Sequence, residues 1–271
     1  EPYRRQRQMC IRDSLGHENR SQNAVILEDT VLYTRRSGGS ISKIAAMKNA
    51  VGNFIDQVTA NATGDPATNE DDVTHRIGIV KFSGNESDQI GNDTYRSDGN
   101  TYNYSQVVQD LTSVTGNVQS LKNTVNELAA AGSTRTDFGL NQAQRVLDGD
   151  WQHGLGGARE EAKQVVVVFT DGEPSTFSNW SGGVAANAVN LAKDLKDDKV
   201  TVYTIGMFED ADPSDTDGRF NKYMNGVSSN YPNAEVTNWR GDRTQDWDDC
   251  KLGTRVTEGN YYLSLIHISE P

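Results

Sequence analysis

The sequence has few cysteines and no long apolar segment. Its 271 residues include two cysteines, and only Cys250 lies outside the terminal segments considered below, so no disulfide framework is indicated. The longest apolar run, Val165–Phe169, covers five residues. A helix that crosses a bilayer needs roughly 20 apolar residues. We therefore predict no membrane span.

Basic residues are also scarce. The chain has 26 Lys and Arg against 38 Asp and Glu, a net charge of −12 and a mean hydropathy of −0.68. This charge repels phosphate at long range, and no stripe of Lys and Arg offsets it. A nucleic-acid partner is not expected. Cations, and basic or neutral surfaces, suit the chain better.

The two ends of the chain are unrelated as protein but related as DNA. Met9–Asp13 can be encoded by atg-tgt-ata-aga-gac, and the shifted reverse complement of that string encodes Ser264–His267. Both ends resemble a translated sequencing-library adapter read inward, although a basic arm and a short apolar strand are the alternative. We expect residues 1–14 and 263–271 to be adapter-derived and residues 15–262 to form a single domain.

The clearest predicted helix begins near Ser42. Apolar side chains recur there at spacings of three and four residues, which places them on one side of a helix. A buried strand is predicted at Ile77–Phe82, and Ser83–Asn85 ends it. The apolar positions of the helix are Ile44, Met47, Val51, Phe54, Ile55 and Val58.

Helices and strands alternate along the rest of the domain. Val165–Thr170 is continuously apolar and β-branched, which is typical of a strand covered on both faces. The order predicts an α/β fold with a doubly wound, mostly parallel sheet and helices on both faces. Residues 209–258 are expected to be a loop-rich insertion. The other predicted elements are helices at about Val118–Gly132, Asp137–Leu147 and Val184–Leu195, and strands at Val200–Gly206 and Asn260–Tyr262.

Two polar loops fall where such a fold binds ligands, outside the carboxyl ends of its strands. Thr170–Pro174 follows the strand that we predict to be the most buried and carries Asp171, and Gly132–Thr136 carries hydroxyls. A carboxylate, hydroxyls and water make a hard oxygen site, which suits Mg²⁺ or Ca²⁺. These loops are therefore the candidate cation site.

At these residues the sequence resembles the von Willebrand factor type A domain. The most specific segments are Val165–Pro174 and Gly132–Thr136, the latter with Gly139 and Leu140. The resemblance covers about residues 24–208 and 259–262. It implies a Rossmann-like fold with a metal-ion-dependent adhesion site, and a final helix after the last strand that we expect to be missing here.

The resemblance also implies the metal ligands. An Asp-x-Ser-x-Ser loop, a Thr loop and an Asp loop hold Mg²⁺, or Mn²⁺ or Ca²⁺, in this family. By position, the ligands implied here are Ser40, Ser42, Thr134 and Asp171.

The first metal loop departs from the family pattern. Ser37–Ser42 keeps two hydroxyls but has Gly38 where the first Asp belongs. A looser alignment starts the motif at Asp29, after a strand at Ala24–Leu27, and inserts Val31–Arg36, whose two arginines oppose cation binding. A read error in this region accounts for the departure equally well. We expect metal binding by the chain as written to be weakened or absent.

The resemblance favours a non-enzymatic adhesion module, most like the bacterial cell-surface and pilus-tip adhesins. Such a module is extracellular and binds the carboxylate of a protein or matrix ligand through its cation. One alternative is an intracellular assembly domain of an AAA+ or chelatase machine, which an adjoining ATPase module would indicate. Another is a doubly wound hydrolase that uses Asp171, for which Glu173 is the nearest second acid in sequence.

Other possible sites carry weaker signals. His17, His75 and His153 have no zinc-site spacing among themselves or with Cys250. The acidic run at 210–218 resembles a calcium loop only loosely, because Pro213 occupies the first ligand position. Solvated or structural roles are the expectation for all of them.

Overall fold

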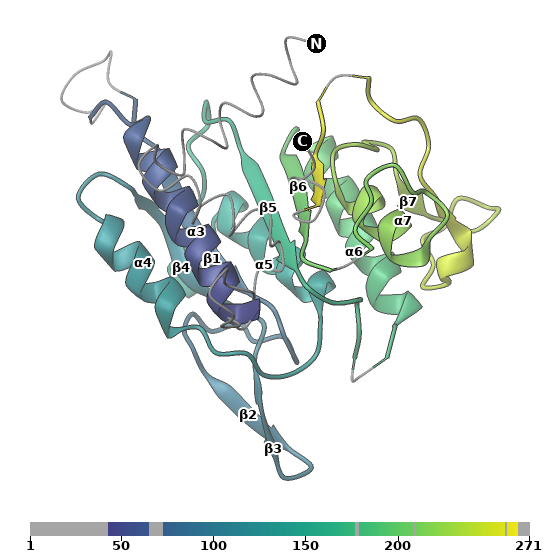
Figure 1. The fold of residues 1–271 in the computed structure, drawn as a ribbon, viewed down its shortest axis with the longest axis horizontal. Coiled ribbons are helices and arrows are strands. Elements are labelled where there is room, and N and C mark those ends of the chain that lie inside the picture. The colour runs from purple at the N-terminus through teal and green to yellow at the C-terminus, as the bar shows by residue number, and fades with distance from the viewer. Residues whose placement is uncertain (1–42, 65–72, 177–178, 209, 258, 265–271) are drawn as a thin grey trace, which may run out of the picture.

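The computed structural model describes residues 43–64, 73–176, 179–208, 210–257 and 259–264. The first half of this part contains α3 (Lys43–Ala60), β1 (Arg76–Lys81), β2 (Thr94–Ser97), β3 (Asn100–Asn103), β4 (Gln106–Ser113), α4 (Val118–Glu127), α5 (Thr136–Asp148) and the short 3-10 helix η2 (Trp151–His153). The second half contains β5 (Val165–Thr170), α6 (Gly182–Asp197), β6 (Thr201–Gly206), α7 (Arg219–Val227), β7 (Glu235–Val236), η3 (Trp247–Asp249), β8 (Cys250–Lys251) and β9 (Tyr262–Ser264). Figure 1 shows their arrangement.

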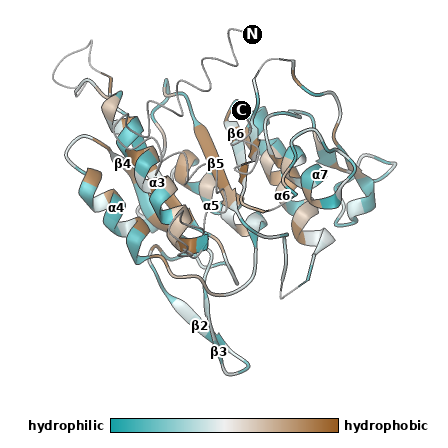
Figure 2. Cartoon of the chain, in the orientation of Figure 1, coloured by the Kyte–Doolittle hydropathy of each residue, from teal (hydrophilic) through white to brown (hydrophobic). Residues whose placement is uncertain are grey.

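A parallel sheet of β5, β6 and β9 confirms the predicted α/β fold. Its register pairs Val168 with Thr204 and Thr204 with Tyr262. β5 stands out as a brown, apolar strand in Figure 2. β9 starts at Tyr262, where the sequence pattern predicts the end of that strand. The predicted absence of a final helix concerns residues that lie outside the described part.

β1 pairs with β4 in an antiparallel ladder, which the sequence pattern does not predict. Between β1 and β4 in sequence, β2 and β3 form a hairpin that projects from the domain and that the sequence analysis does not predict (Figure 1). Asp98 and Gly99 turn this hairpin with φ of 49° and 80°. A two-residue hairpin turn needs positive φ at both positions, which Asp-Gly tolerates well. The Asp-Gly pair was therefore an available signal for the hairpin.

Helices cover the strands on both faces. On one face α3 and α4 pack against β1, with Ile55, Leu121 and Ile79 in one buried cluster. On the other face Leu140 of α5 and Val168 of β5 belong to the main core cluster, which also includes α6 and α7. α4 ends at Glu127, earlier than predicted, because Leu128 is already extended. Within the described residues, every helix is too short or too polar to span a membrane.

α7 lies in the segment for which composition predicts mainly loops. Phe220, Tyr223, Met224 and Val227 follow a helical spacing of three and four residues and line its inner side. Lys196 of α6 reaches the carboxyl end of α7. α7 is therefore packed into the main core cluster.

Candidate functional site

Asp171 follows β5 directly, at the carboxyl edge of the parallel sheet. The hydroxyl of Thr170 donates to the Gly172 carbonyl at 2.9 Å and accepts from the Gly172 amide at 3.4 Å, so the chain turns sharply around Asp171. The Asp171 side chain is 46% exposed. The turn thus presents its carboxylate at the surface of the molecule.

The Thr134 loop is hydrogen-bonded to the segment that follows Asp171. The amide of Thr134 donates to Ser175 Oγ at 3.1 Å, and the amide of Ser175 donates to the Thr134 carbonyl at 3.0 Å. Ser133 Oγ donates to the Thr176 carbonyl at 2.5 Å. Thr134 Oγ1 lies 3.5 Å from where a Cβ on Gly172 would stand. The structure therefore brings the Thr134 hydroxyl to the residue next to Asp171.

Two contacts fix the start of α5 behind this loop. Arg135 binds the buried Asp137 carboxylate through two hydrogen bonds of 2.9 and 2.7 Å. Gly139 lies so close to Phe82 that an added Cβ would stand 2.9 Å from the Phe82 Cβ. The helix therefore approaches β1 closely, and the Thr134 loop at its end has a fixed position.

The amino-terminal end of α3 contributes Lys43, which the sequence analysis missed. Its Nζ lies 3.2 Å from Asp171 Oδ2 and 3.4 Å from the Asp171 carbonyl oxygen. Figure 1 shows the purple start of α3 at the end of the molecule toward which β5 points. The other two predicted ligands, Ser40 and Ser42, and Gly38 lie outside the described residues. Lys43 directly follows Ser42, a predicted metal ligand, and this position in the sequence could have identified it as a residue of the site.

The described donors fit a hard divalent cation by their chemistry. Thr134 offers a neutral hydroxyl and Asp171 a carboxylate, and Mg²⁺ is usually held by one or two carboxylates together with waters. Glu173 is engaged elsewhere, because Arg219 donates to both of its carboxylate oxygens at 2.8 Å. Across the part of the chain that the structure describes, no three His, Cys, Asp or Glu side chains gather as a metal-binding group. Among the described residues, Asp171 and Thr134 are therefore the donors that a cation at this edge would use, together with water.

The acidic run at 210–218 has internal partners. Asp215 Oδ1 accepts from the amides of Asp217 and Gly218 at 2.9 and 2.8 Å, and its Oδ2 accepts from Asn221 at 3.0 Å. The amide of Gly218 is the main cause that holds the pKa of Asp215 below its usual value. These contacts order the loop before α7 and agree with the structural role expected from the sequence.

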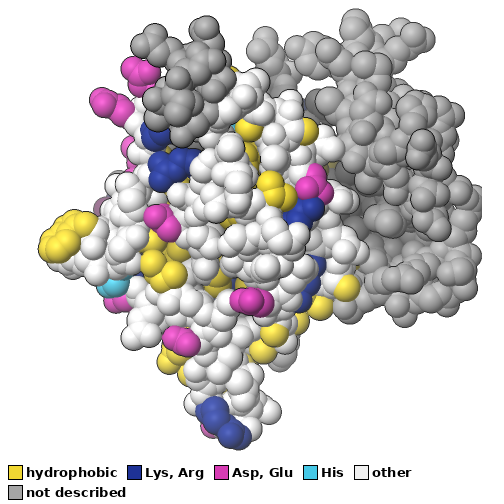
Figure 3. All heavy atoms as spheres, turned by 90° about the vertical axis from the view of Figure 1, so that its left-hand side faces the viewer, with side chains coloured by type: hydrophobic (Ala, Val, Ile, Leu, Met, Phe, Trp, Pro, Cys, Tyr) yellow, Lys and Arg dark blue, Asp and Glu magenta, His cyan; other side chains and the backbone are white. Residues whose placement is uncertain are grey.

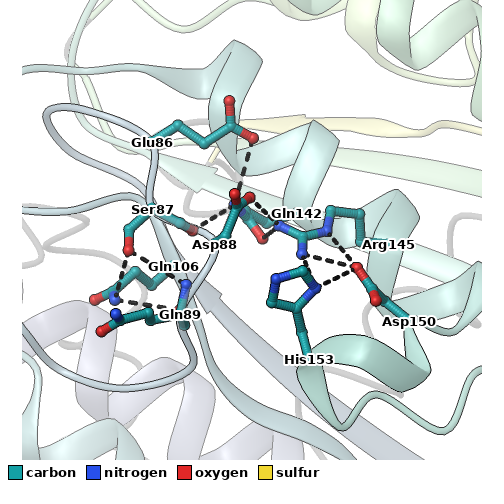
Figure 4. Close-up of polar contacts among 9 residues, drawn as sticks. All are labelled: Glu86, Ser87, Asp88, Gln89, Gln106, Gln142, Arg145, Asp150 and His153. Atoms are coloured by element: carbon teal, nitrogen blue, oxygen red, sulfur yellow. Dashed lines mark hydrogen bonds and ion pairs between the residues drawn. The ribbon is translucent and has the colours of Figure 1, made fainter.

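A second polar cluster surrounds Arg145 on α5 (Figure 4). Its guanidinium lies 3.1 Å from Asp88 Oδ1 and 2.8 Å from Asp150 Oδ2, and His153 Nδ1 is 2.8 Å from the same Asp150 oxygen. The hydrogen bonds from Arg145 and His153 lower the pKa of Asp150 to about 2. Burial raises the pKa of Glu86 nearby. Through Asp88, Arg145 holds the loop after β1 against α5. Because a guanidinium occupies the centre of the cluster, the cluster offers no cation site.

On the face that carries α4, the described Lys and Arg side chains are scattered among acidic ones (Figure 3). Two hollows of about 550 and 440 Å³ are lined by residues other than Thr134 and Asp171. The Asp171 side chain, 46% exposed, lies at an accessible edge of the sheet.

The family model of the von Willebrand factor type A domain matches residues 37–240. No curated protein matches the chain significantly.

Similar solved structures include proximal thread matrix protein 1 from the mussel byssus, at 16% identity and a TM-score of 0.41 over 83% of this chain and 40% of that one. A second structure of that mussel protein, with a zinc-occupied MIDAS motif, matches at 15% identity and a TM-score of 0.38 over 83% of this chain and 40% of that one. The pilus adhesin SpaC of Lactobacillus rhamnosus GG matches at 16% identity and a TM-score of 0.44 over 77% of this chain and 26% of that one. The chain therefore spans 26–40% of the length of these three structures.

Proposed function

Because the chain belongs to the von Willebrand factor type A domain family, we propose that it is a non-enzymatic binding module whose ligand attaches through a divalent cation at the edge formed by Thr134 and Asp171. One observation carries the proposal. The Thr134 loop and the segment that follows Asp171 are hydrogen-bonded to each other at the exposed carboxyl edge of the sheet. Adhesion needs such an accessible edge, since a macromolecular ligand cannot enter a deep pocket.

The chemistry follows from the donors. A bound Mg²⁺, or Mn²⁺ or Ca²⁺, would supply open coordination positions that an acidic side chain of the ligand can fill. Asp171 supplies the protein's negative charge to that cation, and Thr134 supplies a neutral oxygen. We include Ser40 and Ser42 in the proposed ligand set by their place in the family motif.

We propose a protein or matrix component that offers a carboxylate as the ligand, and an extracellular location on a bacterial surface. The family resemblance and the open, acidic and polar surface support these finer points. The net charge of −12 disfavours acidic polymers such as nucleic acids, which need a basic patch. An acidic side chain of a protein ligand is instead drawn to the cation itself.

Calorimetric titration of Mg²⁺ and Mn²⁺ tests the site. We expect Asp171→Asn and Thr134→Ala to weaken binding, Asp171→Asn more strongly because it removes the charge. Asp56→Asn is the matched control, because Asp56 is also an exposed carboxylate, 51% accessible, paired with a lysine. We expect Gly38→Asp, which restores the family's first acid, to tighten binding. Equal affinities for the parent chain, Asp171→Asn and Asp56→Asn would contradict the proposal.

A further inference from the structure

The Asp171 carboxylate already has a cationic partner in the chain. The ammonium of Lys43 lies 3.2 Å from Asp171 Oδ2 and 3.4 Å from the backbone carbonyl oxygen of the same residue. Lys43 therefore contacts two oxygens of Asp171, across 128 positions of sequence. It is the charge that a divalent cation at this edge would have to displace or approach.

The described part of α3 offers Lys43 no acidic neighbour, because its first turn contains no acidic residue. The favourable partner of Lys43 is the carboxylate brought by the turn after β5. The pairing thus points to the Asp171 edge.

We propose that Lys43 is a built-in counter-ion that holds the Asp171 carboxylate when no divalent cation is bound and lowers the cation affinity of the site. This inference rests on the proposed function. The ammonium and a divalent cation compete for one carboxylate, and their charges repel each other at short range. Cation binding therefore requires Lys43 to swing away.

The ion pair is exposed enough to open. The side chains of Lys43 and Asp171 are 47% and 46% accessible, so water can solvate each of them when they separate. An exposed pair of this kind changes an equilibrium constant by a factor of about 1.5 to 5. That factor is large enough to set the cation concentration at which the site fills and small enough for a cation to overcome. Lys43 thus raises the cation concentration needed to fill the site without preventing binding.

The test compares three lysine variants by calorimetric titration with Mn²⁺ and Mg²⁺ at low salt. We expect Lys43→Met to bind about threefold more tightly than the parent chain. Lys43→Arg keeps the charge and should bind like the parent. Lys48→Met is the matched control, because Lys48 lies on the same helix and donates to the Asn126 carbonyl instead. At 0.5 M salt, where screening acts within about 4 Å, the gain of Lys43→Met should shrink.

The outcomes separate the two proposals. Equal or weaker cation binding by Lys43→Met overturns the role of Lys43 and leaves the cation site standing. Tighter binding by Lys48→Met as well would also overturn it, because the effect would then be one of net charge. Absence of binding by the parent chain, by Lys43→Met and by Gly38→Asp alike overturns both proposals. Circular dichroism spectra of all three variants establish that each is folded.

Discussion

Replacement of Lys196 by Met is expected to destabilise the domain. Lys196 lies in the last turn of α6, and its buried ammonium donates to the carbonyl oxygens of Gly226, Ser228 and Tyr231 at 2.8, 3.3 and 3.0 Å. The lysine thereby closes the carboxyl end of α7, where carbonyl groups lack helical partners. Met keeps the apolar stem of the side chain but supplies no donor.

The magnitude follows from two opposing terms. Each buried carbonyl left without a partner costs about 1–3 kcal/mol, whereas removal of a buried ammonium returns several kcal/mol of desolvation. We expect a net loss of about 2–3 kcal/mol, which lowers the melting temperature of a domain of this size by about 4–12 °C. Lys193→Met is the control, because Lys193 forms only an i,i+4 ion pair with Asp197. Such a pair contributes about 0.3–0.5 kcal/mol.

The effect of Lys196→Met should also depend on pH. Burial lowers the pKa of Lys196 from 10.5 to about 7 in the folded chain. Between these values the unfolded chain binds a proton that the folded chain lacks, so the stability of the parent chain rises with pH relative to the variant. The slope is at most about 1.4 kcal/mol per pH unit. Below pH 7 the difference should be constant.

Urea unfolding of the parent chain, Lys196→Met and Lys193→Met at pH 6 and pH 9 measures both effects. A Lys196→Met variant as stable as the parent at both pH values would refute the capping role. A difference that narrows between pH 6 and pH 9 would refute the assigned direction of the pKa shift.

Three further predictions concern other parts of the domain. Gly139→Ala should lower the free energy of unfolding by about 1–3 kcal/mol in thermal melts, because its Cβ would meet that of Phe82 at 2.9 Å. The Cys250 thiol should react about 100-fold more slowly than a free thiol with a disulfide reagent at pH 8, because burial raises its pKa from 9.0 to about 11. Arg145→Met should raise the pKa of Asp150 from about 2 toward 3.8, as measured by NMR titration of its carboxyl.

Each of these predictions has a control. Gly52→Ala on α3 meets nothing within 4 Å and should be neutral or slightly stabilising. The thiol measurement uses Cys10→Ser, so that Cys250 is the single thiol, and urea should restore its full reactivity. A fast reaction in the native state would contradict the burial of Cys250. An unchanged Asp150 titration would remove Arg145 as the main cause of its low pKa.

The sequence predicted the elements whose apolar pattern is local. α3, β5 and β6 lie where apolar periodicity or an unbroken β-branched run places them, because these segments bury one face or both faces without needing unusual partners. β4 and α7 escaped prediction for a physical reason. Both bury polar side chains, such as Gln106 in β4 and Asn225 in α7, and polar residues in a sequence suggest loops until their hydrogen-bond partners are known.

By itself, the sequence determined the α/β order, the likeness to the von Willebrand factor type A domain and the residue types of the Thr134 and Asp171 loops. Only the tertiary structure decided that the Thr134 loop bonds to the segment that follows Asp171 and that Lys43 holds the Asp171 carboxylate. The reason is that a hydrogen bond or an ion pair between distant segments depends on where the strands and helices end in space. Periodicity reports which side of one element is buried and carries no information about the neighbour it meets.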